Sequence, residues 1–287
     1  MIHVHKKMDV SERRACRVLE QPRSSQRYVS TKVGQDATLA ERMVALSKEN
    51  PRYGYRRVWA LLRREGWEVN KKRVQRLWRE AGLRVPAKAR KRRRLGTSEN
   101  GCTRRRAKYI DHVWSYDFAM DATDDGRRLK VMPIVDEYSR ECLALQMERS
   151  ITAEDVVKTL AHLFTERGEP AYIRSDNGPE FISEAIKRWL AACGVETLYI
   201  EPGAPWENAY SETFISCMRD ELLNRELFAD LKEAKVLAED YREHYNHKRP
   251  HGALGYLTPM EFTAIEALSQ QASRVTEELE LASRLSS

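Results

Sequence analysis

Residues 113–120 read Val-Trp-Ser-Tyr-Asp-Phe-Ala-Met, an alternating apolar stretch with the carboxylate of Asp117 at its centre. Alternation with a period of two predicts a β-strand that buries one face. Acidic residues are depleted in strands and costly to bury without a partner, so Asp117 is a candidate functional residue. Taken alone, it fits a charge on an edge strand equally well.

Downstream of this strand the pattern alternates between strands and helices. Asp124-Asp125-Gly126 is a hairpin signal. Further strands are predicted at 129–135, 142–147, 171–174 and 196–200. Amphipathic helices are predicted at 152–167, 183–193, 207–223 and 231–245. The order β-β-β-α-β-α-β predicts an α/β domain in which helices flank a mixed five-stranded sheet.

Upstream of the strands the periodicity is helical. Helices are predicted from Ser11 to Leu19, from Asp36 or Thr38 to Glu49, from Tyr55 to Glu65 and from Lys71 to Ala81, with a loop over 29–35. Asn70 is the expected N-cap of the last helix, and Gly82 its terminator. Helix, short turn and helix form the layout of a helix-turn-helix.

The charge differs in sign between the two parts of the chain. The 287 residues carry a net charge of +7, but residues 1–108 hold 31 Lys and Arg against 10 Asp and Glu, whereas 109–287 hold 19 against 33. A basic part of this kind is typical of a polyanion binder. The segment from Arg84 to Lys108 holds eleven basic residues and one acid, Glu99, and is predicted to be an extended linker that contacts phosphates.

The candidate DNA contacts lie on the last upstream helix and in the linker. They are Lys71, Lys72, Arg73, Gln75 and Arg76, followed by Arg92, Arg93 and Arg94. Such a helix can enter a major groove, where its side chains bond phosphates and guanine edges. The alternative is an ordinary helical bundle with a basic surface.

Two further carboxylates follow Asp117 in the array. Asp176 comes after the short strand at 171–174, at a carboxyl end where α/β sites collect, and Glu212 lies on a late helix. Singly, Asp176 could be a turn former before Asn177 and Gly178, and Glu212 a solvated helix residue. Their combination with Asp117 is more informative, since 35 residues separate Asp176 from Glu212.

These residues carry a resemblance to retroviral-integrase-type DDE transposases, and most closely to the second-frame protein (OrfB) of bacterial insertion sequences of the IS-three family. The matching stretches are 53–57, 114–117, 135–140, 175–181, 202–209, 219–222 and 245–251. The resemblance covers nearly the whole chain. Glu207 departs from the Asp that many members have, a variant that also occurs in the family.

The resemblance implies a ribonuclease H-like fold that binds two Mg²⁺ ions, or Mn²⁺ in their place, through Asp117, Asp176 and Glu212. It implies a polynucleotidyl transferase that cleaves the 3′ ends of an insertion sequence and transfers the strands. Mg²⁺ prefers hard oxygen ligands, which agrees with three carboxylates. The family also implies a DNA contact by Arg219 near the cleavage site, for which a surface salt bridge is an equal alternative. It further implies that Asn177 orients either phosphate or a carboxylate.

The expected partners are double-stranded DNA, namely element ends and target, further copies of the chain on that DNA, and the upstream-frame protein OrfA as a frameshift fusion. The competing hypotheses are a catalytically silent DNA-binding regulator and a nuclease without strand transfer. We expect no membrane span, no secretory signal and no zinc module, hence a bacterial cytoplasmic, nucleoid-associated protein.

The resulting domain division has five parts. They are an N-terminal helical segment (1–35), a helix-turn-helix domain (36–84), a basic linker (85–108), a catalytic domain (109–225) and a C-terminal helical region (226–287). A helix is predicted from Thr258, with Glu261 completing a capping box. Its apolar residues Ile265 and Leu268 serve either packing on the catalytic domain or self-association.

Overall fold

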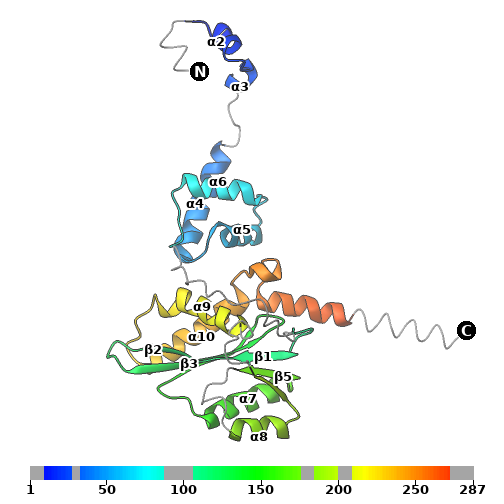
Figure 1. Ribbon diagram of the computed structural model, residues 1–287. Helices are drawn as coiled ribbons and strands as arrows, with labels where there is room; N and C mark the ends of the chain where they lie inside the picture. The colour runs from blue at the N-terminus through cyan, green and yellow to red at the C-terminus, as the bar shows by residue number, and fades with distance from the viewer. Residues whose placement is uncertain (1–9, 28–32, 87–105, 176–183, 200–208, 272–287) are drawn as a thin grey trace, which may run out of the picture. The chain divides into compact units, whose positions relative to one another are not determined.

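The computed structural model describes residues 10–27, 33–86, 106–175, 184–199 and 209–271 (Figure 1). The chain separates into two compact units, residues 1–85 and 86–287. No helix of the described residues is long and apolar enough to cross a membrane.

The first unit is helical throughout its regular elements. They are α2 (Glu12–Val18), α3 (Arg23–Arg27), α4 (Val33–Glu49), α5 (Tyr55–Arg64) and α6 (Lys71–Glu80). A core joins the last three of these helices, formed by Leu39, Met43, Leu46, Val58, Leu62, Val74, Leu77 and Trp78. The predicted N-cap is confirmed, because Asn70 Oδ1 accepts the Arg73 N–H at 2.8 Å.

The start of α4 was predicted too late. The helix begins at Val33, inside the segment 29–35 that we expected to be a loop. Asp36 therefore sits in the first turn and does not cap the helix. Its carboxylate is held instead by two arginines of α6, 37 and 40 residues away, which local sequence patterns cannot reveal.

The second unit is built on a mixed sheet. Its strands are β1 (Val113–Tyr116), β2 (Ala119–Ala122), β3 (Arg128–Asp136), β4 (Cys142–Glu148), β5 (Tyr172–Ser175) and β6 (Glu196–Tyr199). The order is β2-β3-β1-β5-β6, and β4 pairs with the outer edge of β3. β3 is antiparallel to β1, β2 and β4, whereas β1, β5 and β6 run parallel. The α/β prediction with a mixed sheet is confirmed.

The region 113–120, predicted as a single strand, consists of two consecutive strand segments that pair with the same edge of β3. β1 and β2 keep one continuous register against β3, with pairs Tyr116–Ile134 and Ala119–Val131. The sheet thus has six strand segments in the described residues, where five strands were predicted. The interruption consists of residues 117 and 118.

The interruption falls opposite a proline. The common register places Pro133 across from Asp117. Val113 accepts the Glu137 N–H at 3.0 Å, so every second residue from 113, including Asp117, faces β3. Proline has no N–H to donate to the Asp117 carbonyl, and a ladder hydrogen bond is missing there.

Helices cover both faces of this sheet (Figure 1). On one face lie α7 (Ala153–Arg167) and α8 (Glu184–Ala192), and on the other α9 (Ala209–Met218) and α10 (Leu231–His247). The first face buries Trp114, Met132, Ile134, Leu160, Ile173 and Leu190, and the second buries Leu129, Val131, Phe214, Met218, Phe228 and Tyr245. Both cores are continuous with β3, which is why β3 is buried on both faces.

The helix predicted over 207–223 changes character at its end. α9 stops at Met218 and continues as a π-helical turn, η2 (Arg219–Leu223), in which the Asn224 N–H bonds the Arg219 carbonyl five residues back. Residues 200–208, which include the predicted start of this helix, lie outside the described part. Single π-helical turns of this kind are frequent at functional sites.

Residues 259–271 are helical, and the predicted capping box is confirmed. Glu261 Oε2 accepts the Thr258 N–H at 2.7 Å, and Thr258 Oγ1 accepts the Glu261 N–H at 3.1 Å. One side of this helix packs on the rest of the second unit, where the ring centres of Tyr138 and Phe262 lie 5.6 Å apart. Ile265 and Leu268 are exposed, so the structure supports packing at the start of the helix.

Candidate active site

Asp117 lies at the interruption between β1 and β2 and is half-buried. Its Oδ1 accepts the N–H of Phe118 at 2.7 Å, which orients the carboxylate and gives this amide a hydrogen-bond partner at the interruption. An acid in the middle of this strand is therefore neither an ordinary strand residue nor a solvated edge charge. The strand opens at its position.

The carboxyl ends of β1 and β5 lie at the same edge of the sheet. The two strands are parallel neighbours, with Ser115 beside Arg174, and they end at Tyr116 and Ser175. The residue after each strand is an acid, Asp117 in one case and Asp176 in the other. Asp176 and Asn177 themselves lie outside the described residues.

Glu212 lies on α9, which contacts both β1 and β3. The helix buries Ser211, Phe214 and Met218, whereas the side chain of Glu212 is exposed. The amphipathic pattern thus places the carboxylate on the side away from the apolar core. Asp117 and Glu212 are carried by elements in direct contact.

The donors present fit a magnesium ion. Asp117 and Glu212 offer carboxylate oxygens that are accessible to solvent, which is the ligand chemistry that Mg²⁺ prefers. Within the described residues no group of three or more His, Cys, Asp or Glu side chains is placed to hold a metal. The predicted set has only two of its three members in that part of the chain.

Arg219 reaches the sheet from η2. Its Nη2 donates to the carbonyl of Met120 at 3.2 Å. Met120 is even-numbered in the register that turns odd residues toward β3, so its carbonyl is on the open side of β2. The guanidinium of Arg219 therefore lies at the edge of β2 that faces away from β3, beside a residue three positions after Asp117.

The basic face of α6 is partly engaged with the protein. Asp36 binds Arg73 at 2.6 Å and Arg76 at 2.6 Å. Hydrogen bonds from Arg76, and then from Arg73, hold the pKa of Asp36 below its usual range. The Lys71 ammonium lies 4.5 Å from the centre of the Trp59 ring.

The remaining predicted contacts differ in exposure. Lys72 is exposed, and Gln75 is half-buried. Arg92, Arg93 and Arg94 lie outside the described residues. The tertiary partners of Arg73 and Arg76 could not be inferred from a helical wheel, because Asp36 comes from a different helix.

Buried charge near the strand ends was missed by the sequence reasoning. Glu137 follows β3 and receives a hydrogen bond from Arg174 Nε of β5 at 2.8 Å, with side-chain exposures of 0% and 4%. The sequence did contain a sign of this pair, because an arginine such as Arg174 inside a short apolar strand needs an acidic partner. The pair fastens β5 to the end of β3, immediately before the position of Asp176.

Asp136 is buried next to this pair. Its Oδ2 accepts the N–H and the hydroxyl of Ser139, both at 2.7 Å, and Oδ1 accepts the Asp111 N–H at 3.2 Å. Burial raises the pKa of Asp136 to about 6, against the hydrogen bonds from Ser139, which lower it. The guanidinium of Arg140 lies 3.7 Å from the ring centre of Tyr210 on α9.

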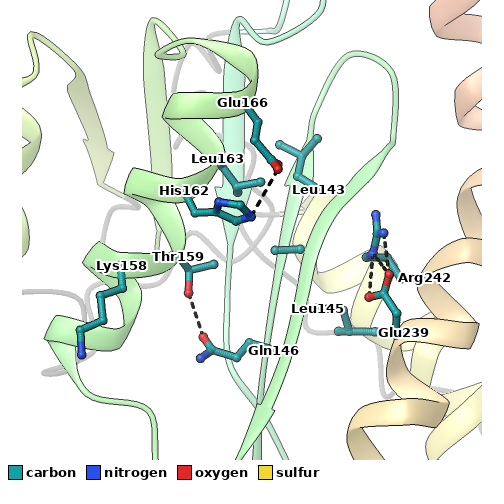
Figure 2. Close-up of a pocket in the computed structure, with 11 residues that line it drawn as sticks. Leu143, Leu145, Gln146, Lys158, Thr159, His162, Leu163, Glu166, Glu239 and Arg242 are labelled. Carbon is teal, nitrogen blue, oxygen red and sulfur yellow. Dashed lines mark hydrogen bonds and ion pairs between the residues drawn. The ribbon is translucent and has the colours of Figure 1, made fainter.

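A cavity of about 620 Å³ lies elsewhere, between β4, α7 and α10 (Figure 2). Its walls carry the pairs His162–Glu166, at 3.4 Å, and Arg242–Glu239, at 2.6 Å. None of the predicted site residues lines it. We therefore assign this cavity no part in the chemistry of the carboxylates.

Three family models match the chain. Two are described as integrase core domain and match residues 110–205 and 193–259, and one is described as an HTH-like domain and matches residues 35–93. Among solved structures, the HTLV-2 integrase catalytic core domain in complex with magnesium is 14% identical, with a TM-score of 0.40, over 55% of this chain and 99% of that chain.

Similar proteins come from bacterial insertion elements. A protein of insertion element IS407 from Burkholderia multivorans is 39% identical over 279 residues, which cover 97% of this chain and 100% of that protein. A protein of insertion element IS476 from Xanthomonas euvesicatoria is 38% identical over 255 residues, 89% of this chain and 73% of that protein. Transposase InsD for insertion element IS2D from Escherichia coli is 31% identical over 228 residues, 75% of this chain and 74% of the transposase.

The integrase core matches coincide with the second unit and the HTH-like match with α4 to α6. With relatives this similar along most of its length, the chain belongs to the IS-three family of insertion-sequence transposases, with an HTH-like region before a ribonuclease H-like integrase core.

Proposed function

We propose that this chain is a DDE transposase that cleaves the 3′ ends of an insertion sequence and joins them to target DNA. Asp117, Asp176 and Glu212 are its catalytic and metal-binding residues. The observation that carries the proposal is the parallel pairing of β1 and β5, which end directly before Asp117 and Asp176, together with the contact of β1 with the helix of Glu212.

When bound, a pair of Mg²⁺ ions would activate the attacking oxygen and stabilise the leaving oxygen of a phosphodiester. The chain's own part is to hold the ligands. The Phe118 N–H orients Asp117 through Oδ1, and the packing of Phe214 and Met218 holds α9 against the sheet so that Glu212 faces solvent. In this proposal Arg219, whose guanidinium donates to the Met120 carbonyl of β2, contacts a DNA phosphate near the cleavage site.

The first unit supplies DNA binding in this proposal. Lys71, Lys72, Gln75 and the arginines of the linker contact phosphates, and Arg73 and Arg76 fix α6 to α4 through Asp36 in addition to any contact with DNA. Lys72→Ala then weakens binding evenly across sequences and lowers the salt slope by about 1. Arg73→Ala also loosens the helix pair, which is visible as lower thermal stability.

DNA as substrate would place the protein on the bacterial nucleoid, as several copies on paired element ends. A fusion with the upstream-frame protein would add a further DNA-binding part.

The deciding experiment uses purified chain, Mg²⁺ or Mn²⁺, and labelled duplexes that carry the element's own ends. Nicks at the 3′ ends and joined strands are expected for the wild type and are lost in Asp117→Asn, Asp176→Ala and Glu212→Gln. Asp121→Asn is the matched control, since Asp121 lies on β2 and its carboxylate bonds the Ala122 N–H. DNA binding without any metal-dependent product, also with the upstream-frame fusion, would refute the proposal in favour of a silent regulator.

A further inference from the structure

The rear face of the α9–η2 helix is held by charge as well as by apolar packing. Phe214, Cys217 and Met218 recur at helical spacing, and Glu221 continues this stripe into η2. Glu212 lies two residues before Phe214, on the opposite side of the helix. The stripe therefore faces the interior of the protein, whereas Glu212 faces solvent.

Arg249 binds this rear face from the segment that follows α10. Its Nε donates to Glu221 Oε2 at 2.7 Å and its Nη2 to Glu221 Oε1 at 2.8 Å, a bidentate pair. The side chains of Arg249 and Glu221 are only 3% and 8% exposed. The same Nη2 lies 3.3 Å from the sulfur of Cys217 on α9.

Aromatic contacts surround the pair. The Arg249 guanidinium lies 5.3 Å from the ring centre of Tyr245, and Tyr245 packs edge-on against Phe214 at 4.7 Å and His251 at 4.6 Å. His251 Nε2 lies 3.4 Å from Arg249 Nη1. One arginine thus connects α9, η2, α10 and the chain that follows it.

Stability alone is a weak reason for such a pair. Replacing a buried ion pair by apolar residues of similar volume is often neutral or stabilising, because both charges lose their hydration when buried. What a planar bidentate pair adds over apolar packing is a defined orientation. Here the oriented element is the one that carries Glu212 on its front side and Arg219 at its π-helical end.

We infer that Arg249 is a positioning residue for the reaction. Through Glu221 it sets the rotation and axial position of the α9–η2 helix, and so the placement of Glu212 and Arg219 beside the ends of β1 and β2. This inference rests on the proposed function for Glu212 and Arg219. It explains why the segment 245–251, far along the chain from the carboxylates, belongs to the same unit.

The test separates orientation from stability. The double variant Glu221→Leu/Arg249→Leu removes both buried charges and should melt close to the wild type, unlike Arg249→Met, which removes the guanidinium from the buried Glu221. The cleavage rate of the double variant should fall roughly tenfold to a hundredfold, because small displacements of catalytic groups reduce the rate by that much. Half-maximal cleavage should need more Mg²⁺, while the Kd for element ends stays unchanged.

Two further variants calibrate the result. Arg249→Lys keeps the charge without the planar fork and should show an intermediate loss. Arg242→Lys is the matched control, because the half-buried Arg242 of α10 pairs with the exposed Glu239 at 2.6 Å. This variant should cleave like the wild type. Hydrogen exchange gives a readout that needs no catalysis. In the double variant exchange should rise in 209–223 and stay unchanged in β3.

The outcomes distinguish this inference from the proposed function. If the wild type cleaves and the folded double variant cleaves at the same rate with the same Mg²⁺ dependence, Arg249 is no positioning residue. If the wild type does not cleave, the proposed function fails. Hydrogen exchange in residues 209–223 then decides alone whether Arg249 positions the α9–η2 helix. Unchanged exchange there in the double variant then overturns the positioning role as well.

Discussion

The buried carboxyl of Asp136 should contribute stability to the second unit that is lost as the pH rises from about 4 to about 6, opposite in sign to acids of the unit whose pKa is lowered, such as Asp155 and Glu239. The pKa of Asp136 is raised by burial from the ordinary 3.8 to about 6 in the folded state. An acid with a raised folded pKa stabilises the fold fully below its unfolded pKa, and this contribution is lost as the pH rises through the folded pKa. At about 1.36 kcal/mol per unit, the loss is about 3 kcal/mol.

Asp136→Asn should abolish this dependence. The amide oxygen can still accept from Ser139, but the amide nitrogen then faces the Asp111 N–H, where Oδ1 accepts at 3.2 Å in the native protein. That lost hydrogen bond costs about 1–3 kcal/mol at every pH. The variant is therefore less stable than the wild type at pH 4 and comparable to it at pH 7.

Urea unfolding of both proteins between pH 4 and pH 7.5, followed by fluorescence and circular dichroism, measures the difference. Asp124→Asn, at an exposed position, is the control and should keep the slope of the wild type. A stability difference between the wild type and Asp136→Asn that does not shrink as the pH rises from 4 to 6 would refute the reasoning. In that case the hydrogen bonds from Ser139 would stabilise the carboxylate in its charged form.

Three further effects follow from individual contacts. Arg174→Met leaves Glu137 buried without its partner and should lower the free energy of unfolding by about 3–5 kcal/mol, and Glu137→Leu added to it should recover most of this loss in the same denaturation assay. Asn246→Leu removes the amide that pairs with both backbone groups of Cys142 on β4, at 2.9 and 2.8 Å, and should cost about 1–3 kcal/mol, with faster hydrogen exchange at Cys142. Asn70→Ala removes the cap of α6 and should cost about 1 kcal/mol in thermal unfolding, with an unchanged melting transition speaking against the cap.

Helices with local end signals were predicted closely. Asn70 caps α6, Thr152 and Asp155 form the capping box of α7, and the helix after Thr258 begins with its own box. In each case the deciding atoms are within three residues of one another. The apolar runs that predicted β3 and β4 are local in the same sense, and the resemblance of motifs to a known family extended these patterns to a fold.

Features that depend on distant partners were missed or placed wrongly. Asp36, in the first turn of α4, is held by arginines of α6, and the first strand is interrupted where Pro133 of β3 faces Asp117. Neither partner can be recognised before the helices pack or the strands pair. The position of Asp117 in the strand was visible in the sequence, but the reason that the strand opens there was not.

The candidate site divides along the same line. Residue types and spacing marked Asp117, Asp176 and Glu212 as candidates, and the resemblance of the surrounding motifs to a known family selected them from the 33 acids of residues 109–287. The parallel pairing of β1 with β5, the contact of α9 with β1, and the Arg249–Glu221 pair behind Glu212 emerge only in the folded chain. The sequence determines which side chains are present and which local backbone structure they favour. Contacts between distant residues, such as Arg249 and Glu221, which lie 28 positions apart, form only when the whole unit folds and buries its core.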